Sequence, residues 1–301
     1  MAIYDADGNE INAIWNADGN ALDSAYDCDG NKIYESRSPI MGDLRIMAYN
    51  VGGWWVGRAT SVPASQDVKY YALQNKILNN WLPDILCIEE YRDEFTVGGR
   101  TALSVLSPYF QYIESLDGDG SVGYIGHAIC SKYPILSFTK HNYGSDKQRY
   151  YSTAVIDVNG TEISVVVTHI STNGNARISQ VTHLFNYAET LTNAIVCGDF
   201  NLHCHSKTDV YEGTGLVEWE SYRQWVEAGY HMANNSDEFG FMDTYFSEAY
   251  DQWYSLDNII VSPNITINNA YVDTTKRTEP ITSDPNWKYD HSPLIADISI
   301  N

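Results

Sequence analysis

Residues 152–169 read STAVIDVNGTEISVVVTH, and this stretch decides the fold class. Two runs rich in Val, Ile and Thr flank Asn159-Gly160, a strong hairpin-turn signal because glycine adopts positive φ without steric cost. We therefore predict two antiparallel strands. Arg149 lies ten residues before Asn159, and His169 lies nine after Gly160. In-register pairing should bring them to one edge of the sheet, within about one residue pair of each other.

Short apolar runs of strand length recur on both sides of this hairpin, and Val, Ile and short length favour strands. They are LRIMAY (44–49), DILCI (84–88), HAICS (127–131), AIVCG (194–198), NIIVS (258–262) and LIADISI (294–300). Longer stretches with helical spacing lie between them, at 65–82 with Ser65 as a candidate N-cap, at 176–191 and at 217–228. Strands mixed with helices predict an α/β protein.

The composition is that of a protein with a sizeable core, because 44% of the 301 residues are hydrophobic. No apolar run approaches the ~20 residues of a membrane-spanning helix, and the acidic N-terminus does not resemble a secretory signal. We expect a soluble protein, cytoplasmic or phage-associated. Cys87, Cys130 and Cys197 lie in apolar runs, which predicts buried free thiols and no disulfide framework.

The net charge of −21, from 18 basic and 39 acidic residues, argues against an architectural DNA-binding protein. Tight non-specific binding of nucleic acid rests on many Lys and Arg contacts to phosphate. An enzyme that reaches a phosphate through bound cations remains compatible with this charge, because a metal ion inverts the local electrostatics.

The first forty residues contain an eleven-residue repeat: YDADGNEI from Tyr4, WNADGNAL from Trp15 and YDCDGNKI from Tyr26. The Asp-Gly-Asn turns predict short β-hairpins. The spacing of a calcium-binding EF-hand is absent, so solvated turns are the simpler interpretation. An attachment or oligomerisation role is one hypothesis for this segment. We expect the repeats and a linker in residues 1–40, and a catalytic domain in residues 42–301.

Polar side chains cluster at the ends and beginnings of the predicted strands. One rim of an antiparallel sheet collects the ends of strands that run one way and the starts of those that run the other. We therefore expect the following residues, together with Arg149, to line one pocket: Asn50, Glu89, Glu90, His169, Asp199, Asn201, Asp257, Asp290 and His291. By contrast, the consecutive residues 203–205 (HCH) cannot readily surround one tetrahedral ion, and we interpret them as a loop.

This residue set suits hydrolysis of a phosphoester. Clustered carboxylates and amide oxygens bind hard cations such as magnesium, manganese or calcium, which polarise a phosphoryl oxygen. An aspartate beside an asparagine can deprotonate an attacking water, and histidine and arginine can hold phosphate oxygens. Acyl transfer is less well served, because the chain has no G-x-S-x-G motif.

Seven blocks occur in the order found in the endonuclease/exonuclease/phosphatase superfamily, which the chain resembles over residues 44–300. They are LRIMAYN, PDILCIEE, GHAICSKYPI, THIS, GDFN, SLDNIIVS and YDHSP. This superfamily includes pancreatic-type deoxyribonucleases, abasic-site endonucleases and inositol polyphosphate 5-phosphatases. The resemblance implies a four-layered α/β sandwich, with two mostly antiparallel sheets packed face to face and helices outside.

The resemblance also implies a role for each site residue. It makes His169, Asp199, Asn201, Asp257 and His291 catalytic, Arg149, Asn201 and His291 phosphate-contacting, and Asn50, Glu90 and Asp290 metal-binding. The metal would be Mg²⁺, with Mn²⁺ or Ca²⁺ as alternatives. Glu89 stands where the superfamily usually has Gln, which adds a charge near the metal.

Three functions remain open from the sequence. The first is metal-dependent hydrolysis of a phosphodiester by an activated water, with nucleic acid as a candidate substrate. The second is a phosphomonoesterase acting on a phosphorylated metabolite or a lipid headgroup. The third is a catalytically silent binding module attached through the repeats, and the intact set of Glu90, Asp199, Asn201, Asp257 and His291 argues against it.

Overall fold

The computed structural model divides the chain into two compact units, Met1–Pro39 and Ile40–Asn301. In the first unit, β1 (Ser24–Tyr26) pairs antiparallel with β2 (Lys32–Glu35). The first two repeats lie outside the described residues, so their hairpins stay predictions, as do the domain boundary and the attachment role. The structure describes residues 24–26, 32–35, 42–52, 73–91, 101–116, 126–143, 146–204, 206–208, 218–247, 251–274 and 291–301.

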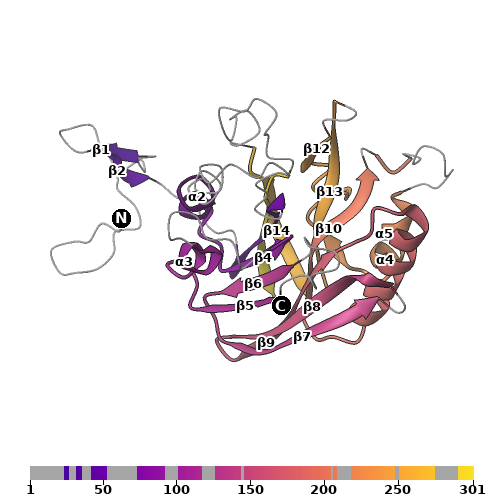
Figure 1. Ribbon diagram of the computed structural model, residues 1–301, viewed down its shortest axis with the longest axis horizontal. Helices are drawn as coiled ribbons and strands as arrows, with labels where there is room; N and C mark the ends of the chain where they lie inside the picture. Colours follow the sequence, from indigo (N-terminus) through magenta and orange to yellow (C-terminus); the bar gives the residue numbers. More distant parts are fainter. Residues whose placement is uncertain are drawn as a thin grey trace. The chain divides into compact units, whose positions relative to one another are not determined.

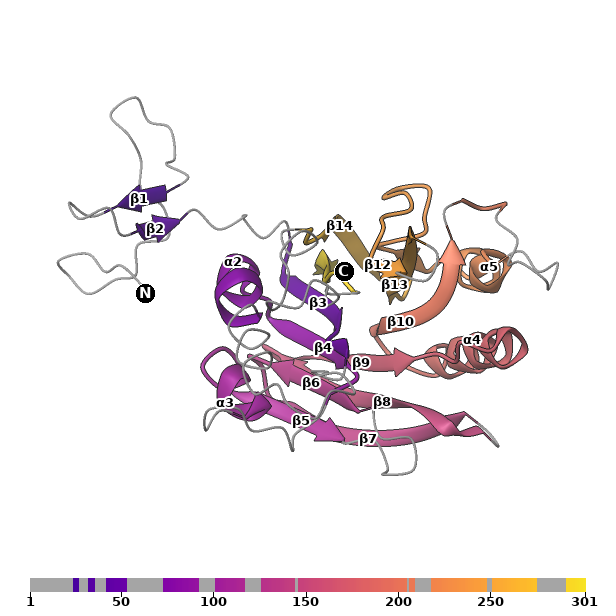
Figure 2. The same ribbon diagram turned by 45° about the horizontal axis from the view of Figure 1, so that its top comes forward.

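The second unit contains two sheets that face each other (Figures 1 and 2). The six-stranded sheet runs in the order β14 (Ile265–Val272), β15 (Leu294–Ile300), β3 (Leu44–Asn50), β4 (Ile85–Glu89), β6 (His127–Ser131) and β5 (Tyr112–Leu116). Its central pair, β3 and β4, is parallel, and its other pairs are antiparallel.

The seven-stranded sheet has the same mixed character. Its order is β11 (His231–Met232), β13 (Gln252–Val261), β10 (Ala194–Cys204), β9 (Thr161–His169), β8 (Asp146–Val158) and β7 (Ile135–Tyr143), and β12 (Tyr245–Ser247) also pairs with β13. Here β9 and β10 are parallel, and the remaining pairs are antiparallel.

The hairpin predicted around Asn159-Gly160 is present as the antiparallel pair β8 and β9. Val158 pairs with Thr161 beside the turn, and Tyr151 pairs with Thr168 near the far end. Asn159 adopts φ of 53° and Gly160 of 93°, the left-handed conformations that the Asn-Gly signal predicts. Arg149 therefore lies one residue from the position opposite His169, which confirms the predicted register.

The core between the sheets follows from strand alternation. Leu44, Ile46 and Ala48 on β3 face the other sheet, whereas Met47 and Tyr49 face the opposite side. Both faces of the central strands are buried, so their sequences are nearly continuous apolar runs and not alternating ones. Cys87, Cys130, Cys197 and Cys204 are buried and free, as predicted for the first three.

Helices cover the outer face of each sheet and complete the predicted four-layered α/β sandwich. A π-helical turn (Leu73–Leu78), α2 (Asn79–Trp81) and α3 (Ala102–Leu106) pack on the six-stranded sheet. The helices α4 (Gly174–Ala188) and α5 (Glu220–Glu227) lie side by side on the seven-stranded sheet (Figure 2). Among the described residues, the longest helix is too short and too polar to cross a membrane.

One prediction of local structure is wrong in part, and another falls partly outside the described residues. In the 65–82 stretch the structure describes residues from 73 onward, as a π-helical turn followed by α2, and Ser65 lies outside the described residues. The interpretation of residues 203–205 as a loop is wrong for His203 and Cys204, because β10 continues to Cys204. After a register shift, Cys204 pairs with Ser255. Residue 205 lies outside the description.

Candidate active site

Polar side chains from both sheets converge at one rim, as the sequence pattern predicted. In the seven-stranded sheet, Asp199 on β10 lies between His169 on β9 and Asp257 on β13. In the other sheet, Asn50 at the end of β3 pairs with Glu89 at the end of β4. His169, Asn50 and Glu89 are the last residues of their strands. Asp199 and Asp257 lie within β10 and β13, at the point where the regular register between these two strands ends.

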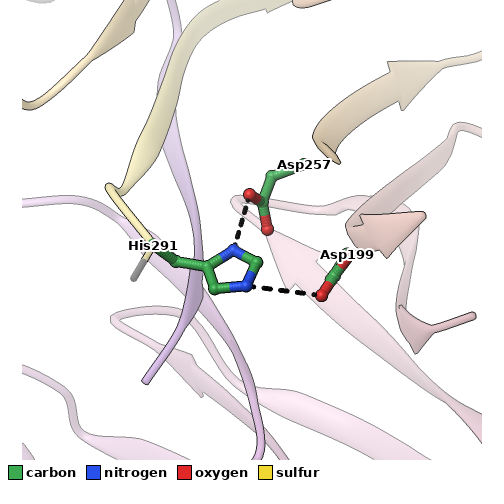
Figure 3. A group of neighbouring side chains, drawn as sticks. All are labelled: Asp199, Asp257 and His291. Carbon is green, nitrogen blue, oxygen red and sulfur yellow. Dashed lines mark hydrogen bonds and ion pairs between the residues drawn. The ribbon is translucent and has the colours of Figure 1, made fainter. Parts of the chain in front are cut away.

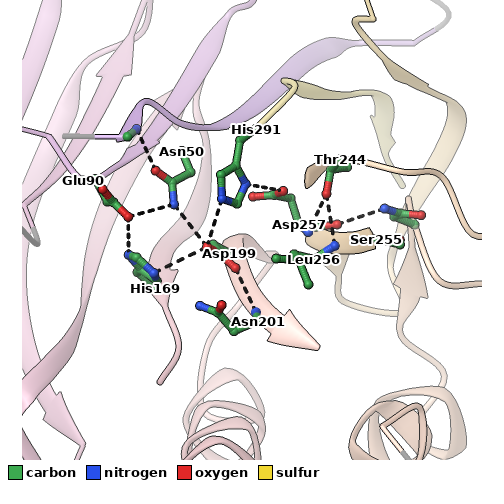
Figure 4. Close-up of polar contacts among 12 residues, drawn as sticks. Asn50, Glu90, His169, Asp199, Asn201, Thr244, Ser255, Leu256, Asp257 and His291 are labelled. Carbon is green, nitrogen blue, oxygen red and sulfur yellow. Dashed lines mark hydrogen bonds and ion pairs between the residues drawn. The ribbon is translucent and has the colours of Figure 1, made fainter. Parts of the chain in front are cut away.

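The Asp199 carboxylate lies at the centre of the cluster (Figure 4). Its Oδ2 atom accepts a hydrogen bond from Asn50 Nδ2 at 3.1 Å and lies 3.4 Å from His169 Nε2. The same oxygen is 3.6 Å from His291 Nε2. Asn50 lies on β3 of the six-stranded sheet and His291 lies just before β15 of the same sheet. Asp199 and His169 lie on the seven-stranded sheet, so the Asp199 carboxylate joins the two halves of the site.

A second carboxylate orients His291 (Figure 3). The Nδ1 atom of His291 lies 2.9 Å from Asp257 Oδ2, which leaves Nε2 facing Asp199. Thr244 fixes the backbone on which Asp257 sits, because its Oγ1 accepts the N–H groups of Leu256 and Asp257 at 3.1 and 3.0 Å. An imidazole held at Nδ1 by a carboxylate presents a defined proton donor or acceptor at Nε2.

Two site residues adopt left-handed backbone conformations that non-glycine residues rarely occupy. Glu90 has φ of 55° and follows the last residue of β4, and Asn201 has φ of 50°. Such conformations cost about 1–3 kcal/mol and persist only where the surroundings hold them. The conformation at Glu90 accompanies a side chain that reaches the cluster, where Oε1 accepts from Asn50 Nδ2 at 3.3 Å and lies 3.9 Å from His169 Nδ1.

Burial sets the protonation of the central groups. It raises the pKa of Asp199 to about 6, with His291 acting in the opposite direction and Asp257 adding to the rise. Burial also lowers the pKa of His169 well below its usual value, and the positive charge of Arg149 adds to that effect. An aspartate whose pKa lies near neutrality is a better proton acceptor than an ordinary one.

The structure brings most of the predicted site residues together, while their roles stay predictions. Arg149 lies on β8 at the same rim, close enough to lower the pKa of His169. Its contact to a substrate phosphate stays a prediction. Asp290 lies outside the described residues. The assembled residues are Asn50, Glu90, His169, Asp199, Asn201, Asp257 and His291.

Sequence reasoning missed His127 and Thr244. His127 starts β6, and its fully buried ring packs against Tyr150 with 4.5 Å between ring centroids. Its Nδ1 lies 3.3 Å from Ser152 Oγ, and its Nε2 has no hydrogen-bond partner among the described residues. The position of His127 is a usable signal, because it is the first residue of a strand that pairs antiparallel with β4 and so lies at the same rim. Thr244 offers no comparable signal in the sequence.

The donor set fits a hard divalent cation. Oxygens of Glu90 and Asp199 approach a single atom, Asn50 Nδ2, and therefore converge on one small region. Asp257 Oδ1 and both carboxylate oxygens of Glu89 are buried without a hydrogen-bond partner in the described part of the chain. One atom each from Asp199, Asp257 and His291 also lies within 4.8 Å of the others. Such a concentration of buried carboxylate oxygen calls for compensating positive charge.

Several solved structures have a similar fold. The human Nocturnin catalytic domain is 17% identical with a TM-score of 0.60, and covers 87% of this chain and 97% of its own. A 3′ phosphatase, NExo from Neisseria, bound to product DNA hairpin, is 17% identical with a TM-score of 0.59, covering 84% and 98%. An AP endonuclease from Archaeoglobus fulgidus has the same identity, score and coverage. These likenesses define the fold, and no curated protein is similar in sequence.

The endonuclease/exonuclease/phosphatase family model matches residues 15–284, most of the chain. The protein therefore belongs to the endonuclease/exonuclease/phosphatase family, as the sequence blocks indicated. Members of this family are hydrolases that use divalent metal ions to cleave phosphodiester or phosphomonoester bonds.

The buried neutral His127 should make the fold sensitive to acid. Burial lowers the pKa of this ring to about 3, and Arg149 and Lys140 add to the shift. Below about pH 6.5, the unfolded chain binds a proton that the folded chain refuses until about pH 3, so stability is lost as pH falls through this window. The His127→Gln variant should lose less stability on acidification, by up to ~1.4 kcal/mol per pH unit in urea unfolding.

The matched control is His231→Gln, because His231 is exposed on β11. This variant should keep the wild-type dependence of unfolding free energy on pH. Identical pH profiles for wild type and His127→Gln would show that His127 does not cause the acid sensitivity.

Proposed function

We propose that the protein hydrolyses a phosphodiester by attack of a water that Asp199 deprotonates. The observation that supports this most strongly is the position of Asp199 Oδ2. This oxygen lies within 3.6 Å of side-chain nitrogens of Asn50, His169 and His291, which come from three different segments of the chain. Its pKa of about 6 suits proton transfer near neutral pH. The other oxygen, Oδ1, accepts the backbone N–H of Asn201 at 2.8 Å, which fixes the carboxylate plane.

His291 and Asn201 are assigned to the phosphate. Asp257 holds His291 at Nδ1, so that Nε2 can donate a hydrogen bond to a phosphoryl oxygen when the ring is protonated. Asn201 Nδ2 carries two protons and gives one to the Ile170 carbonyl at 2.9 Å, which fixes the orientation of its amide. His169 contacts both carboxylates, with Nδ1 3.9 Å from Glu90 Oε1 and Nε2 3.4 Å from Asp199 Oδ2.

Glu90 and Asn50 are the residues that would hold the divalent cation, with Asp290 as a further candidate. The hydrogen bonds from Asn50 Nδ2 to Glu90 and Asp199 support a cation position beside the proposed water-activating group. A bound divalent cation polarises a phosphoryl oxygen and stabilises negative charge in the transition state. Mg²⁺ and Mn²⁺ suit the oxygen donors best.

Nucleic acid is the substrate class that we favour. The Neisseria phosphatase with the same fold is described as bound to a DNA hairpin, and the Archaeoglobus protein is an AP endonuclease. The net charge of −21 leaves few cations for a long phosphate backbone, which favours a short contact at the reacting phosphate over an extended groove. Hydrolysis of a phosphomonoester is the second candidate, because the Neisseria protein is a 3′ phosphatase.

The two candidates are separated by hydrolysis of bis-(p-nitrophenyl) phosphate, p-nitrophenyl phosphate and a short DNA duplex, with Mg²⁺ or Mn²⁺ and with EDTA. We expect metal-dependent cleavage of the diesters, abolished by EDTA. Cleavage of the monoester alone would establish the phosphatase. No turnover of any of these substrates or of a panel of phosphorylated metabolites would contradict the proposal and favour the silent binding module.

Replacing His291 with alanine should lower kcat by at least about tenfold, because a charge-assisted contact to the transition state contributes more than about 1.4 kcal/mol. The thermal midpoint should stay close to that of the wild type. The control is His183→Ala, an exposed histidine on α4, which should leave kcat unchanged. Full activity of a folded His291→Ala protein would remove this residue from the mechanism.

A further inference from the structure

We propose that Arg177 is a positioning residue, which with Glu218 holds Asn201 in its left-handed conformation and so orients the Asp199 carboxylate. This inference rests on the proposed function of Asp199. Arg177 lies on α4, and Glu218 lies just before α5, both on the outer face of the seven-stranded sheet. Neither residue carried a signal in the sequence analysis.

Arg177 binds both partners at once. Its Nη1 donates to the Asn201 carbonyl at 2.5 Å, and its Nη2 donates to Glu218 Oε1 at 2.6 Å. The Arg177 side chain is 2% exposed and that of Glu218 is 4% exposed, so the charge pair is screened little by water. The planar guanidinium reaches two acceptors in fixed directions, which a lysine ammonium on a flexible stem does not do.

Asn201 needs such a constraint, because its φ of 50° lies where non-glycine residues rarely remain. Three of its groups are bound to fixed partners. Its N–H donates to Asp199 Oδ1, its Nδ2 donates to the Ile170 carbonyl, and its carbonyl accepts from Arg177. Loss of the Arg177 contact frees the carbonyl, and the backbone can then relax towards a more common conformation.

Helix α4 also braces the neighbouring loop. Gln180, one turn after Arg177, accepts the Ser171 N–H at 2.8 Å. Ile170, which precedes Ser171, donates its backbone N–H to the Asp199 carbonyl at 2.8 Å, and its own carbonyl accepts from Asn201 Nδ2. Residues three apart on a helix share a face, so Arg177 and Gln180 can act on both loops that flank Asp199.

The consequence for Asp199 concerns direction. While the Asn201 N–H is bound to Oδ1, the other oxygen, Oδ2, must face Asn50, His169 and His291. A relaxed Asn201 withdraws that N–H, and the carboxylate can turn away from the water that it deprotonates. Misorientation of a catalytic group lowers the rate of the chemical step more than it lowers substrate affinity.

The variants Arg177→Lys and Glu218→Gln test whether these two residues hold Asn201 in place. In Arg177→Lys, kcat should fall by at least about tenfold while KM stays within about threefold, because Asp199 acts in the chemical step and His291 still contacts the phosphate. Glu218→Gln keeps an acceptor oxygen for Arg177 and should retain more activity than Arg177→Lys. The matched control is Arg45→Lys, because Arg45 is also buried and binds Asp297 through Nε at 2.7 Å and through Nη2 at 3.0 Å. It stands near the start of β3, whereas the site lies at the end.

Backbone amide exchange supplies a readout that does not depend on activity. In Arg177→Lys, exchange at the Asn201 amide should accelerate by about tenfold or more, while the Val196 amide in the middle of β10 keeps its rate. In Arg45→Lys, the Asn201 amide should exchange as in the wild type and kcat should stay within about twofold, even though the thermal midpoint falls.

The inference is overturned if Arg177→Lys keeps wild-type kcat and wild-type exchange at Asn201. It is also overturned if Arg45→Lys lowers kcat as much as Arg177→Lys at an equal loss of stability, because the effect would then be one of stability alone. Wild-type protein without any phosphoesterase activity would instead contradict the proposed function. Amide exchange would still show in that case whether Arg177 holds Asn201.

Discussion

The hydrogen bond from Asn50 Nδ2 to Asp199 Oδ2 is the interaction on which the proposed mechanism depends, because it joins the rims of two different sheets. Its geometry is set by the apolar core between the sheets, where Leu44, Ile46 and Ala48 of β3 belong to the same cluster as residues of β9 and β10. Interiors packed at crystal-like density deform little. The separation of the two rims is therefore fixed by hydrophobic packing remote from the chemistry. This packing also sets the distances between the polar residues of the two rims.

The site gathers groups that a stable interior would avoid. Glu89 is fully buried with no hydrogen-bond partner for either oxygen among the described residues, and burial raises its pKa well above the usual value, with Asp257 adding to the rise. Left-handed Glu90 and Asn201 add backbone strain. Local violations of this kind concentrate at functional sites, where the surrounding structure holds them in place. The surrounding structure here is extensive, because both faces of β3, β4, β9 and β10 are covered.

Much of the fold could be read from the sequence, and the exceptions have physical causes. Every apolar run became a strand, because strands buried on both faces need continuous hydrophobic sequence. The unpredicted β5, β7 and β14 are edge strands, whose half-exposed polar side chains conceal them. The position of polar residues beside predicted strands identifies Asn50, Glu90, His169, Asp199, Asn201, Asp257 and His291. Thr244 and Arg177 have no such signal, because they act through backbone groups brought near by tertiary packing. Such contacts leave no pattern in local sequence.

The central claim is that Asp199 activates the water, and the Asp199→Asn variant tests it most directly. Asparagine keeps the size of the side chain and an oxygen for the Asn201 N–H, but it cannot accept the proton. With Mn²⁺ and bis-(p-nitrophenyl) phosphate, the account predicts a fall in kcat/KM of at least about a thousandfold. The thermal midpoint should stay within a few degrees of the wild type. A folded Asp199→Asn protein that keeps more than about a tenth of wild-type kcat/KM would contradict the account.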